Sequence, residues 1–251
     1  MTKKAPSLGA WLEEKPFTLA LSSSFFGFYA HCGLAAALFE AGLKPAKLTG
    51  ASAGALVAGA LASGIEPAEL KEILFALKRE DFWDPAPGFG YLRGKKFRSR
   101  LEELFAPSFA SAQLPLEVAV FDLLAWKTTF LKEGSVATAV VASCAVPLLF
   151  HPVRIGRRVY LDGGLFHKSG VAKAPGERIL CAYIERSDSV SSAYEWGSSL
   201  KSLGEGQKIL RLDGLPAVGY NALGAGQAAY EQAYQRMRRA LIAPAEKVMR
   251  G

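Results

Sequence analysis

Histidine is scarce in this chain, which limits the groups available as a catalytic base. The three histidines are His31, His151 and His167. Cysteine is equally scarce, with no CxxC pair and no cysteine–histidine cluster; the three cysteines are Cys32, Cys144 and Cys181. This spacing predicts no metal site and no disulfide framework. Free cysteines in apolar surroundings are typical of a reducing, cytoplasmic compartment.

Long apolar runs are also missing. No uninterrupted run reaches the roughly 18 residues that a membrane-spanning helix needs, so the sequence predicts no such helix. The N-terminal stretch MTKKAPSLGAWLEEKPF carries two lysines, but Glu13, Glu14 and Lys15 interrupt the place where a signal peptide has its apolar centre. We therefore expect the mature chain to start here and to be cytoplasmic.

Acidic residues are outnumbered, with 23 acidic against 30 basic side chains and a net charge of +7. Basic residues cluster in three stretches, Arg93–Arg100, Arg154–Arg158 and Arg236–Arg239. Neither zinc-finger spacing nor a basic heptad pattern accompanies them, so the sequence predicts no nucleic-acid partner. Two interpretations stay open: solvated surfaces, or peripheral contact with an anionic membrane.

Short apolar strands alternate with helical patterns along the chain. Strands are expected at Phe17–Ser22, Ala46–Gly50, Leu116–Leu124, Lys127–Leu131, Arg178–Glu185 and Lys208–Leu212, with a hairpin at Val153–Leu161. Helices are expected at His31–Leu43, Ala53–Gly64, Glu66–Arg79, Lys95–Phe105, Ser135–Ala145 and Gly224–Ile242, and a loop at Asp84–Gly94. Such alternation predicts an α/β fold with three α/β/α layers and a mostly parallel central sheet.

We expect one domain over residues 1–251. Its motif-bearing core spans about residues 17–164, and the C-terminal strands and helix extend it to about residue 242. Half of the residues are hydrophobic, which is enough to build one sizeable core at this length.

The stretch GASAG, from Gly50 to Gly54, matches the pattern G-x-S-x-G between a predicted strand and a predicted helix. A nucleophilic serine in that context sits on a strained turn, and small residues on either side avoid collisions with the neighbouring strand and helix. The start of the helix also supplies backbone N–H groups beside a developing oxyanion. The alternative interpretation is that Ser52 is only a small residue packed at a tight turn.

A serine hydroxyl needs a base, and the histidines are poorly placed to provide one. Only His167 follows a plausible acid, and it comes five residues after Asp162, too close for a separate strand-end loop. His31 and His151 are interpreted as hydrogen-bonding residues at a helix start and in a loop. The other candidate base is Asp162 itself, because a partly desolvated carboxylate accepts a hydroxyl proton readily. Its competing interpretation is an ordinary Asp-Gly turn.

Taken together, these stretches resemble the patatin-like phospholipase family. The resemblance rests on GASAG, on DGG at residues 162–164, and on the block ASCAVPLLFHPVRIGRRVYLDGG, which is similar to the family's A-S-x-x-x-P-x-x-F-x-P stretch. The preceding VAVFDLLAWKTTFLKEGSVATAV looks like the family's strand and helix before that block. The resemblance runs from about residue 17 to residue 164, with weaker support to residue 241.

The resemblance implies a Ser–Asp dyad that needs no histidine. By this analogy, Ser52 attacks an ester carbonyl to form an acyl-enzyme, and Asp162 takes the proton and activates the water for hydrolysis. The motif glycines are Gly50, Gly54, Gly163 and Gly164. The family hydrolyses acyl esters of lipids and needs neither a metal nor an organic cofactor.

The chain departs from the family at the oxyanion loop, which is usually rich in glycine. The corresponding stretch here reads LALSSSFFGFYAHCG. One alignment replaces the first two glycines by Ser22 and Ser24, and another places Ser23, Ser24 and Phe25 there, with Gly27 in place of the arginine. The expected oxyanion-hole residues are Ser23, Ser24, Phe25, Gly27 and Ala53. Backbone N–H groups of any residue can serve, but glycine reaches positive φ with the least strain.

Three functional hypotheses follow. The first is a serine acyl-ester hydrolase of the phospholipase, lipase or esterase type. The second, motivated by the altered loop, is a catalytically weak patatin-like protein that acts as a lipid-binding or regulatory module. The third is a Ser–His–Asp hydrolase, which the histidine positions disfavour. Four nearby aromatic residues are interpreted either as an apolar lip for an acyl chain or as core; they are Phe25, Phe26, Phe28 and Tyr29.

Overall fold

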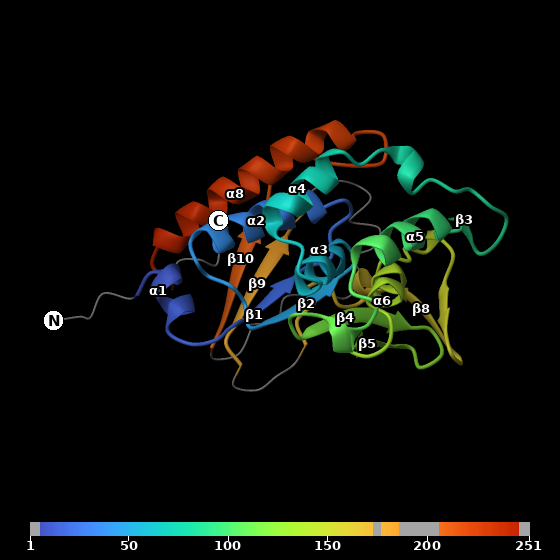
Figure 1. Cartoon of the computed structure of the whole chain (residues 1–251), viewed down its shortest axis with the longest axis horizontal. Helices are drawn as coiled ribbons and strands as arrows, with labels where there is room; N and C mark the ends of the chain where they lie inside the picture. The colour runs from blue at the N-terminus through green and yellow to red at the C-terminus, as the bar shows by residue number, and fades with distance from the viewer. Residues whose placement is uncertain (1–5, 173–176, 186–205, 246–251) are drawn as a thin grey trace.

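The computed structural model describes residues 6–172, 177–185 and 206–245 (Figure 1). Eight strands form the main sheet in the order β10-β9-β1-β2-β4-β8-β7, with β5 also pairing with β4. Their bounds are β1 Thr18–Leu21, β2 Lys47–Ala51, β4 Leu116–Asp122, β5 Lys127–Leu131, β7 Val153–Ile155, β8 Arg158–Asp162, β9 Ile179–Ile184 and β10 Gln207–Leu212.

The predicted α/β class is confirmed, with a sheet that is mixed. Strands β10, β9, β1, β2 and β4 pair in parallel, whereas β5 and β8 run antiparallel to β4, and β7 runs antiparallel to β8. Short connections account for the β4–β5 and β7–β8 pairs, because a few residues can join only antiparallel neighbours. Gly156 turns the predicted β7–β8 hairpin with a φ of +57°.

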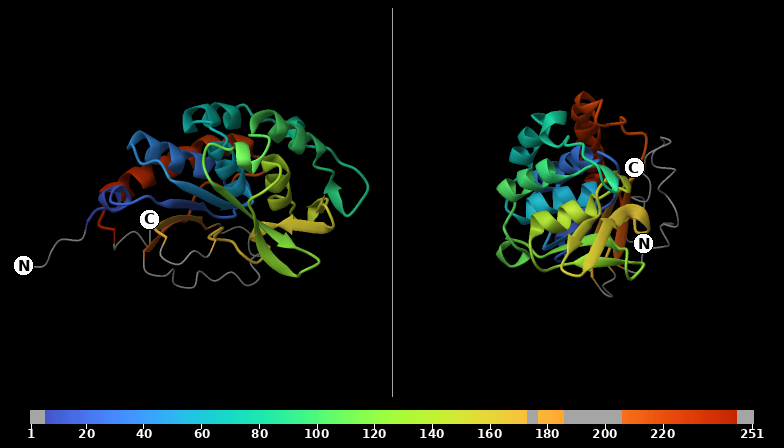
Figure 2. Two further views of the ribbon diagram at one scale, coloured as in Figure 1. Left: turned by 60° about the horizontal axis from the view of Figure 1, so that its bottom comes forward. Right: turned by 90° about the vertical axis from the view of Figure 1, so that its right-hand side faces the viewer.

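The helices pack against this sheet and against one another. Their bounds are α1 Leu8–Glu13, α2 Phe28–Glu40, α3 Ala53–Ala62, α4 Pro67–Phe75, α5 Lys95–Leu104, α6 Val136–Ser143 and α8 Gly226–Ile242. Short 3₁₀ turns lie at Arg79–Asp81, Phe109–Ser111, Gly163–Leu165 and Leu223–Ala225. Helices α3, α5 and α6 form a layer beside the sheet, and α8 lies along α2 (Figures 1 and 2).

Several local predictions differ from the structure. Helix α1 was not predicted, and the helix expected over Glu66–Arg79 ends at Phe75. The Pro- and Gly-rich stretch predicted as loop contains a short strand, β3 (Gly90–Leu92), which pairs in parallel with β6 (Leu148–Phe150). This pairing joins segments far apart in the chain, so local composition does not reveal it. Helix α2 begins at Phe28 rather than at His31. The turn before it, in which the Gly27 N–H donates to the Ser24 carbonyl, continues directly into the first turn of the helix.

The α2–α8 contact depends on a glycine. A Cβ on Gly33 would lie 2.2 Å from the carbonyl oxygen of Tyr230, which is backbone and cannot turn aside. Small residues let two helices approach this closely, and the crossing buries Leu34, Leu38 and Met237 in the main core.

Gly33→Ala is therefore expected to destabilise the protein by roughly 1–3 kcal/mol, because the added methyl group forces α8 away from α2. Denaturant unfolding measures the change. Gly219→Ala is the matched control, since nothing lies within 4 Å of a Cβ placed there. A Gly33→Ala protein as stable as wild type would show that the crossing is looser than described.

Candidate active site

Ser52 occupies the sharp turn between β2 and α3. Its backbone has a φ of +50° and a ψ of −121°, a conformation that residues other than glycine rarely adopt. The residue caps the N-terminus of α3 and is 8% exposed. The side chain therefore lies at the positive end of a helix, on a backbone held in a strained conformation, as a nucleophile elbow requires.

The motif glycines leave no room for side chains. A Cβ on Gly50 would lie 2.6 Å from the backbone of Gly54, and one on Gly54 would lie 2.1 Å from the carbonyl oxygen of Leu21. The steric reason for small residues at these two positions is thus visible in the packing of α3 against β1 and β2. Both glycines allow the strand–turn–helix to close tightly around Ser52.

Ser143 is a site residue that the sequence analysis missed. Its hydroxyl accepts the Ser52 N–H at 2.8 Å and donates to the Ala119 carbonyl at 2.6 Å, and it is fully buried. The bridge fixes the Ser52 backbone to β4 through the last residue of α6. A serine ending the apolar pattern VATAVVAS was the available signal, because a buried hydroxyl needs a partner.

The sheet register brings Asp162 to Ser52. Ala51 of β2 pairs with Ala119 of β4, and the next β4 residue, Val120, pairs with Asp162 at the end of β8. Ser52 directly follows Ala51, so the two polar side chains flank the same point of β4. Residues 110 positions apart in the sequence thereby meet at one end of the sheet.

The Asp162 carboxylate is buried and only partly hydrogen bonded. Its Oδ1 accepts the Gly164 N–H at 2.7 Å, whereas Oδ2 is buried without a partner of standard hydrogen-bond geometry. Burial raises the pKa of Asp162 to about 6, and the nearby Ser52 hydroxyl and the Gly164 N–H oppose that rise. A carboxylate of this kind has a spare acceptor atom and the proton affinity of a base that works near neutral pH.

Gly163 and Gly164 pack tightly beside this carboxylate. A Cβ on Gly163 would lie 2.0 Å from the Ala119 carbonyl oxygen, and one on Gly164 would lie 2.0 Å from Ser23 Oγ. The two glycines thus allow the chain to turn immediately after Asp162. They also bring the 22–24 loop against the site.

Cys144 is the third reactive group at this place. Burial and the Asp162 carboxylate raise the pKa of the Cys144 thiol well above its usual range, despite the opposing effect of the Ser52 hydroxyl. The thiol is therefore protonated near neutral pH and is a poor nucleophile.

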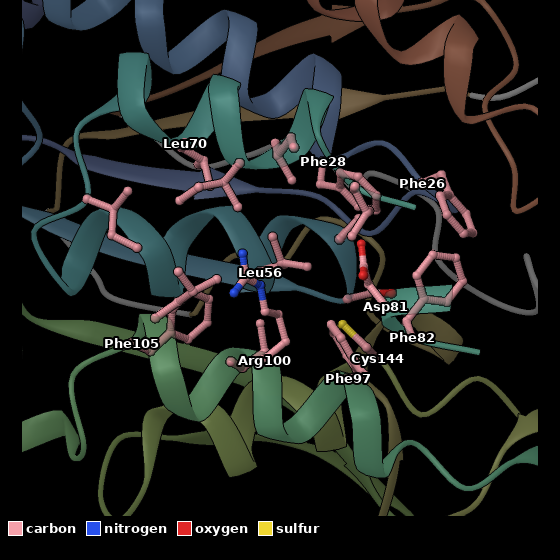
Figure 3. A pocket seen from close by; sticks show the side chains of 18 of the residues that line it. Phe26, Phe28, Leu56, Leu70, Asp81, Phe82, Phe97, Arg100, Phe105 and Cys144 are labelled. Atoms are coloured by element: carbon pink, nitrogen blue, oxygen red, sulfur yellow. The ribbon is translucent and has the colours of Figure 1, made fainter. Parts of the chain in front are cut away.

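An apolar cavity of about 160 Å³ opens beside Ser52. Helices α3, α4 and α5 enclose it, and side chains such as Leu56, Leu70 and Phe105 point into it (Figure 3). Asp81 and Arg100 are the charged residues of its wall. A space of this composition suits a hydrocarbon chain. Phe25, Phe26 and Phe28 line it, and Phe28 also belongs to the buried core together with Tyr29.

The loop expected to form the oxyanion hole uses two of its N–H groups elsewhere. Ser23 donates to the Lys168 carbonyl at 2.7 Å and Gly27 donates to the Ser24 carbonyl at 2.8 Å. Within the described residues, the N–H groups of Ser24 and Ala53 have no acceptor. Phe25 lines the cavity with Ser52.

The loop's strain falls on a residue that the sequence analysis did not single out for it. Phe26 has a φ of +55°, in the left-handed region that glycine favours. The serines of the loop are not among the residues with positive φ.

Each histidine is engaged with a backbone carbonyl. The partners are Ser22 for His31 at 2.8 Å, Ala86 for His151 at 3.4 Å and Val171 for His167 at 2.8 Å. Burial lowers the pKa of His31 to about 4, so this ring is neutral near pH 7. None of the three rings is among the residues that line the Ser52 cavity.

Metal-ligand clusters and membrane spans were sought in residues 6–172, 177–185 and 206–245. No group of three His, Cys, Asp or Glu side chains gathers there as a metal site. In the same ranges, no helix has the length and apolar character needed to cross a bilayer.

Known proteins resemble this chain in sequence. The family model described as patatin-like phospholipase matches residues 19–174. Uncharacterized NTE family proteins of Mycobacterium bovis (strain ATCC BAA-935 / AF2122/97) and Mycobacterium tuberculosis (strain ATCC 25618 / H37Rv) are each 30% identical over 162 residues. The match covers 63% of this chain and 45% of each relative, so the chain spans less than half the length of these relatives.

Among solved structures, VipD from Legionella pneumophila has a similar fold, with a TM-score of 0.68 at 16% sequence identity. The match covers 90% of this chain and 66% of VipD. The similar structure agrees with the observed α/β architecture, and the family match spans both the Ser52 turn and the Asp162 turn. The chain therefore belongs to the patatin-like phospholipase family.

Proposed function

We propose that this protein is a serine hydrolase of acyl-ester lipids, with Ser52 as nucleophile and Asp162 as base. The observation that carries the proposal is the pairing of a strained serine turn with a buried carboxylate whose Oδ2 is free to accept a proton. An apolar cavity opens at the same serine, so the reactive oxygen lies where a hydrocarbon chain would end.

The reaction would run through an acyl-enzyme. Ser52 Oγ attacks the ester carbonyl carbon while Oδ2 of Asp162 takes the hydroxyl proton. The tetrahedral intermediate collapses, the carbon–oxygen bond to the alcohol breaks, and Asp162 returns the proton to the leaving alcohol. Asp162 then takes a proton from water as the water oxygen attacks the acyl carbon. The bond between that carbon and Ser52 Oγ breaks, and Asp162 returns its proton to Oγ, which releases the carboxylic acid and restores the serine hydroxyl.

The oxyanion donors available for this chemistry are the N–H groups of Ala53 and Ser24. Ala53 is the first residue of α3, so its N–H adds to the positive end of the helix dipole beside the developing charge. Ser143 acts as a positioning residue, because its hydroxyl holds the Ser52 N–H and keeps that group away from the oxyanion.

A catalytically weak lipid-binding protein is the second candidate function. The observation that favours it is the oxyanion loop, in which the N–H groups of Ser23 and Gly27 already donate hydrogen bonds to backbone carbonyls. Losing one oxyanion donor typically lowers kcat by roughly 10²–10³. Turnover of a soluble ester far below that of ordinary esterases, together with tight binding of a fatty acid in the cavity, would favour this candidate.

The substrate class and location remain part of the proposal. Peripheral contact with an anionic membrane, one of the two interpretations of the net charge of +7, would bring the cavity to its lipid substrate. A cytoplasmic location is the accompanying expectation.

Ser52→Ala is expected to abolish hydrolysis of p-nitrophenyl butyrate, and Asp162→Asn to lower kcat by roughly 10²–10⁴, because nucleophile and base are lost. Neither variant should unfold at a markedly lower temperature than wild type. Ser99→Ala, an exposed serine on α5, is the matched control and should keep full activity. Severe destabilisation by both site variants would instead favour a purely structural role for the pair.

The pH dependence of kcat/KM should report the Asp162 carboxyl. The base form is the carboxylate, so activity is expected to rise with pH through about 6, the raised pKa of Asp162. A profile that rises near pH 4 would contradict the burial that raises this pKa.

The same pKa predicts a change in stability. Because folding raises the pKa above its ordinary value of 3.8, the stabilisation is complete below that pH and is lost as pH rises through about 6. Wild type should therefore lose stability relative to Asp162→Asn between pH 4 and pH 7, as measured by thermal unfolding.

His167→Ala is expected to leave kcat/KM within about twofold of wild type, because the ring hydrogen-bonds the Val171 carbonyl and does not line the cavity. Ester hydrolysis by the folded variant measures this. A loss of several powers of ten would point to a Ser–His–Asp triad.

A further inference from the structure

Three large apolar side chains project from one end of the molecule. Phe89 is 89% exposed, Leu148 is 81% exposed and Tyr91 is 55% exposed. The parallel pairing of β3 with β6 brings them together, because Gly90 is the partner of Leu148. We name these three residues the apolar tip; β3 extends at the edge of the fold in Figure 1.

The backbone under the apolar tip is braced. The Asp84 carboxylate accepts the N–H groups of Gly94, Lys95 and Lys96 at 2.9, 2.7 and 3.2 Å, which ties the end of the 85–93 segment to the start of α5. Gly90 packs directly on the Phe150 backbone, since a Cβ there would lie 2.3 Å away. The side chains are thus held out toward solvent by a defined scaffold.

The backbone of Leu148 is strained, and burial of its side chain does not offset this strain in the isolated protein. Its φ of +66° lies in the left-handed region, which is strained for a bulky side chain. The side chain gains little from burial, being 81% exposed. An exposed apolar residue on a strained backbone indicates a surface that is covered by a partner.

The apolar tip adjoins the cavity of the proposed active site. Cys144, Val146 and Phe150 line that cavity, and Leu148 lies between the last two in the same chain segment. Whatever covers the tip therefore lies beside a wall of that cavity.

Charge around the tip selects the partner. Residues 84–100 contain five basic side chains and one acidic one, Asp84, and residues 144–158 contain three basic side chains and no acidic one. Arg93 and Lys95, which follow β3 in the chain, are exposed and form no ion pair with another described residue. Exposed apolar side chains beside unpaired basic groups suit an anionic lipid surface, where the apolar groups enter the acyl region and the cations meet phosphates.

We propose that the apolar tip inserts into an anionic phospholipid bilayer and docks the mouth of the Ser52 cavity on the lipid surface. Membrane docking is inferred from the apolar tip and does not depend on the proposed catalytic function. Only the delivery of lipid to Ser52 rests on that function. A bilayer fits this surface better than a protein does, because the chain segments of the tip combine exposed apolar side chains with an excess of basic residues.

The test uses the double variant Phe89→Ser/Leu148→Asn, in which asparagine tolerates the left-handed backbone at position 148. The control is Ile242→Ser, which removes a side chain that is 82% exposed at the far end of α8. Co-sedimentation with vesicles of phosphatidylcholine, with and without phosphatidylglycerol, measures binding. Hydrolysis of p-nitrophenyl butyrate and thermal unfolding run in parallel.

We expect wild type and Ile242→Ser to bind the phosphatidylglycerol vesicles equally and more tightly than the neutral ones. The double variant should bind at least tenfold more weakly, with soluble-ester hydrolysis and unfolding temperature unchanged. Equal binding by the double variant, equal weakening by Ile242→Ser, or no binding by wild type would overturn the proposal. So would a monomer–dimer equilibrium that the double variant abolishes, because that result assigns the tip to a second copy.

The two proposals fail in different ways. If wild type does not hydrolyse the soluble ester but loses vesicle binding with the double variant, the docking surface stands and the catalytic assignment falls. If hydrolysis depends on Ser52 while all proteins bind vesicles equally, the catalytic assignment stands and the docking surface falls.

Discussion

One backbone position, Ala119 in the middle of β4, organises the candidate site. Its carbonyl oxygen accepts the Ser143 hydroxyl, and it lies where a side chain on Gly163 would collide. Ala119 also pairs with Ala51, the residue before the serine, and its successor pairs with Asp162. Two turns from distant parts of the sequence are thus fixed against the same point of β4. The burial that raises the proton affinity of Asp162 is a consequence of this convergence.

The sequence was informative where chemistry follows from local pattern. A serine between a strand and an apolar helix predicts a turn at Ser52, and an aspartate at a strand end followed by two glycines predicts one at Asp162. Long-range contacts were beyond that reasoning. The bridge through Ser143 depends on how α6 lies over β4, and the β3–β6 pairing joins segments about 60 residues apart. Neither contact produces a periodic pattern in the local sequence from which it could be predicted.

The oxyanion loop shows a similar limit at the level of the backbone. Its residue types predicted strain at the serines, whereas the left-handed conformation falls on Phe26. Which N–H groups are free depends on carbonyls that arrive from other elements, such as Lys168 opposite Ser23. The ability of the loop to stabilise an oxyanion therefore depends on which of its N–H groups are free. The proposed hydrolase and the weakly active lipid binder differ chiefly in these few donors.

The most direct measurement is covalent labelling of the folded protein by a fluorophosphonate probe, with the modified residue located by mass spectrometry. The account predicts one adduct, on Ser52, that forms in wild type, is missing in Ser52→Ala and forms much more slowly in Asp162→Asn. Folded wild-type protein that stays unlabelled, or that carries the adduct on another serine, would contradict the assignment of Ser52 and Asp162 as a catalytic pair.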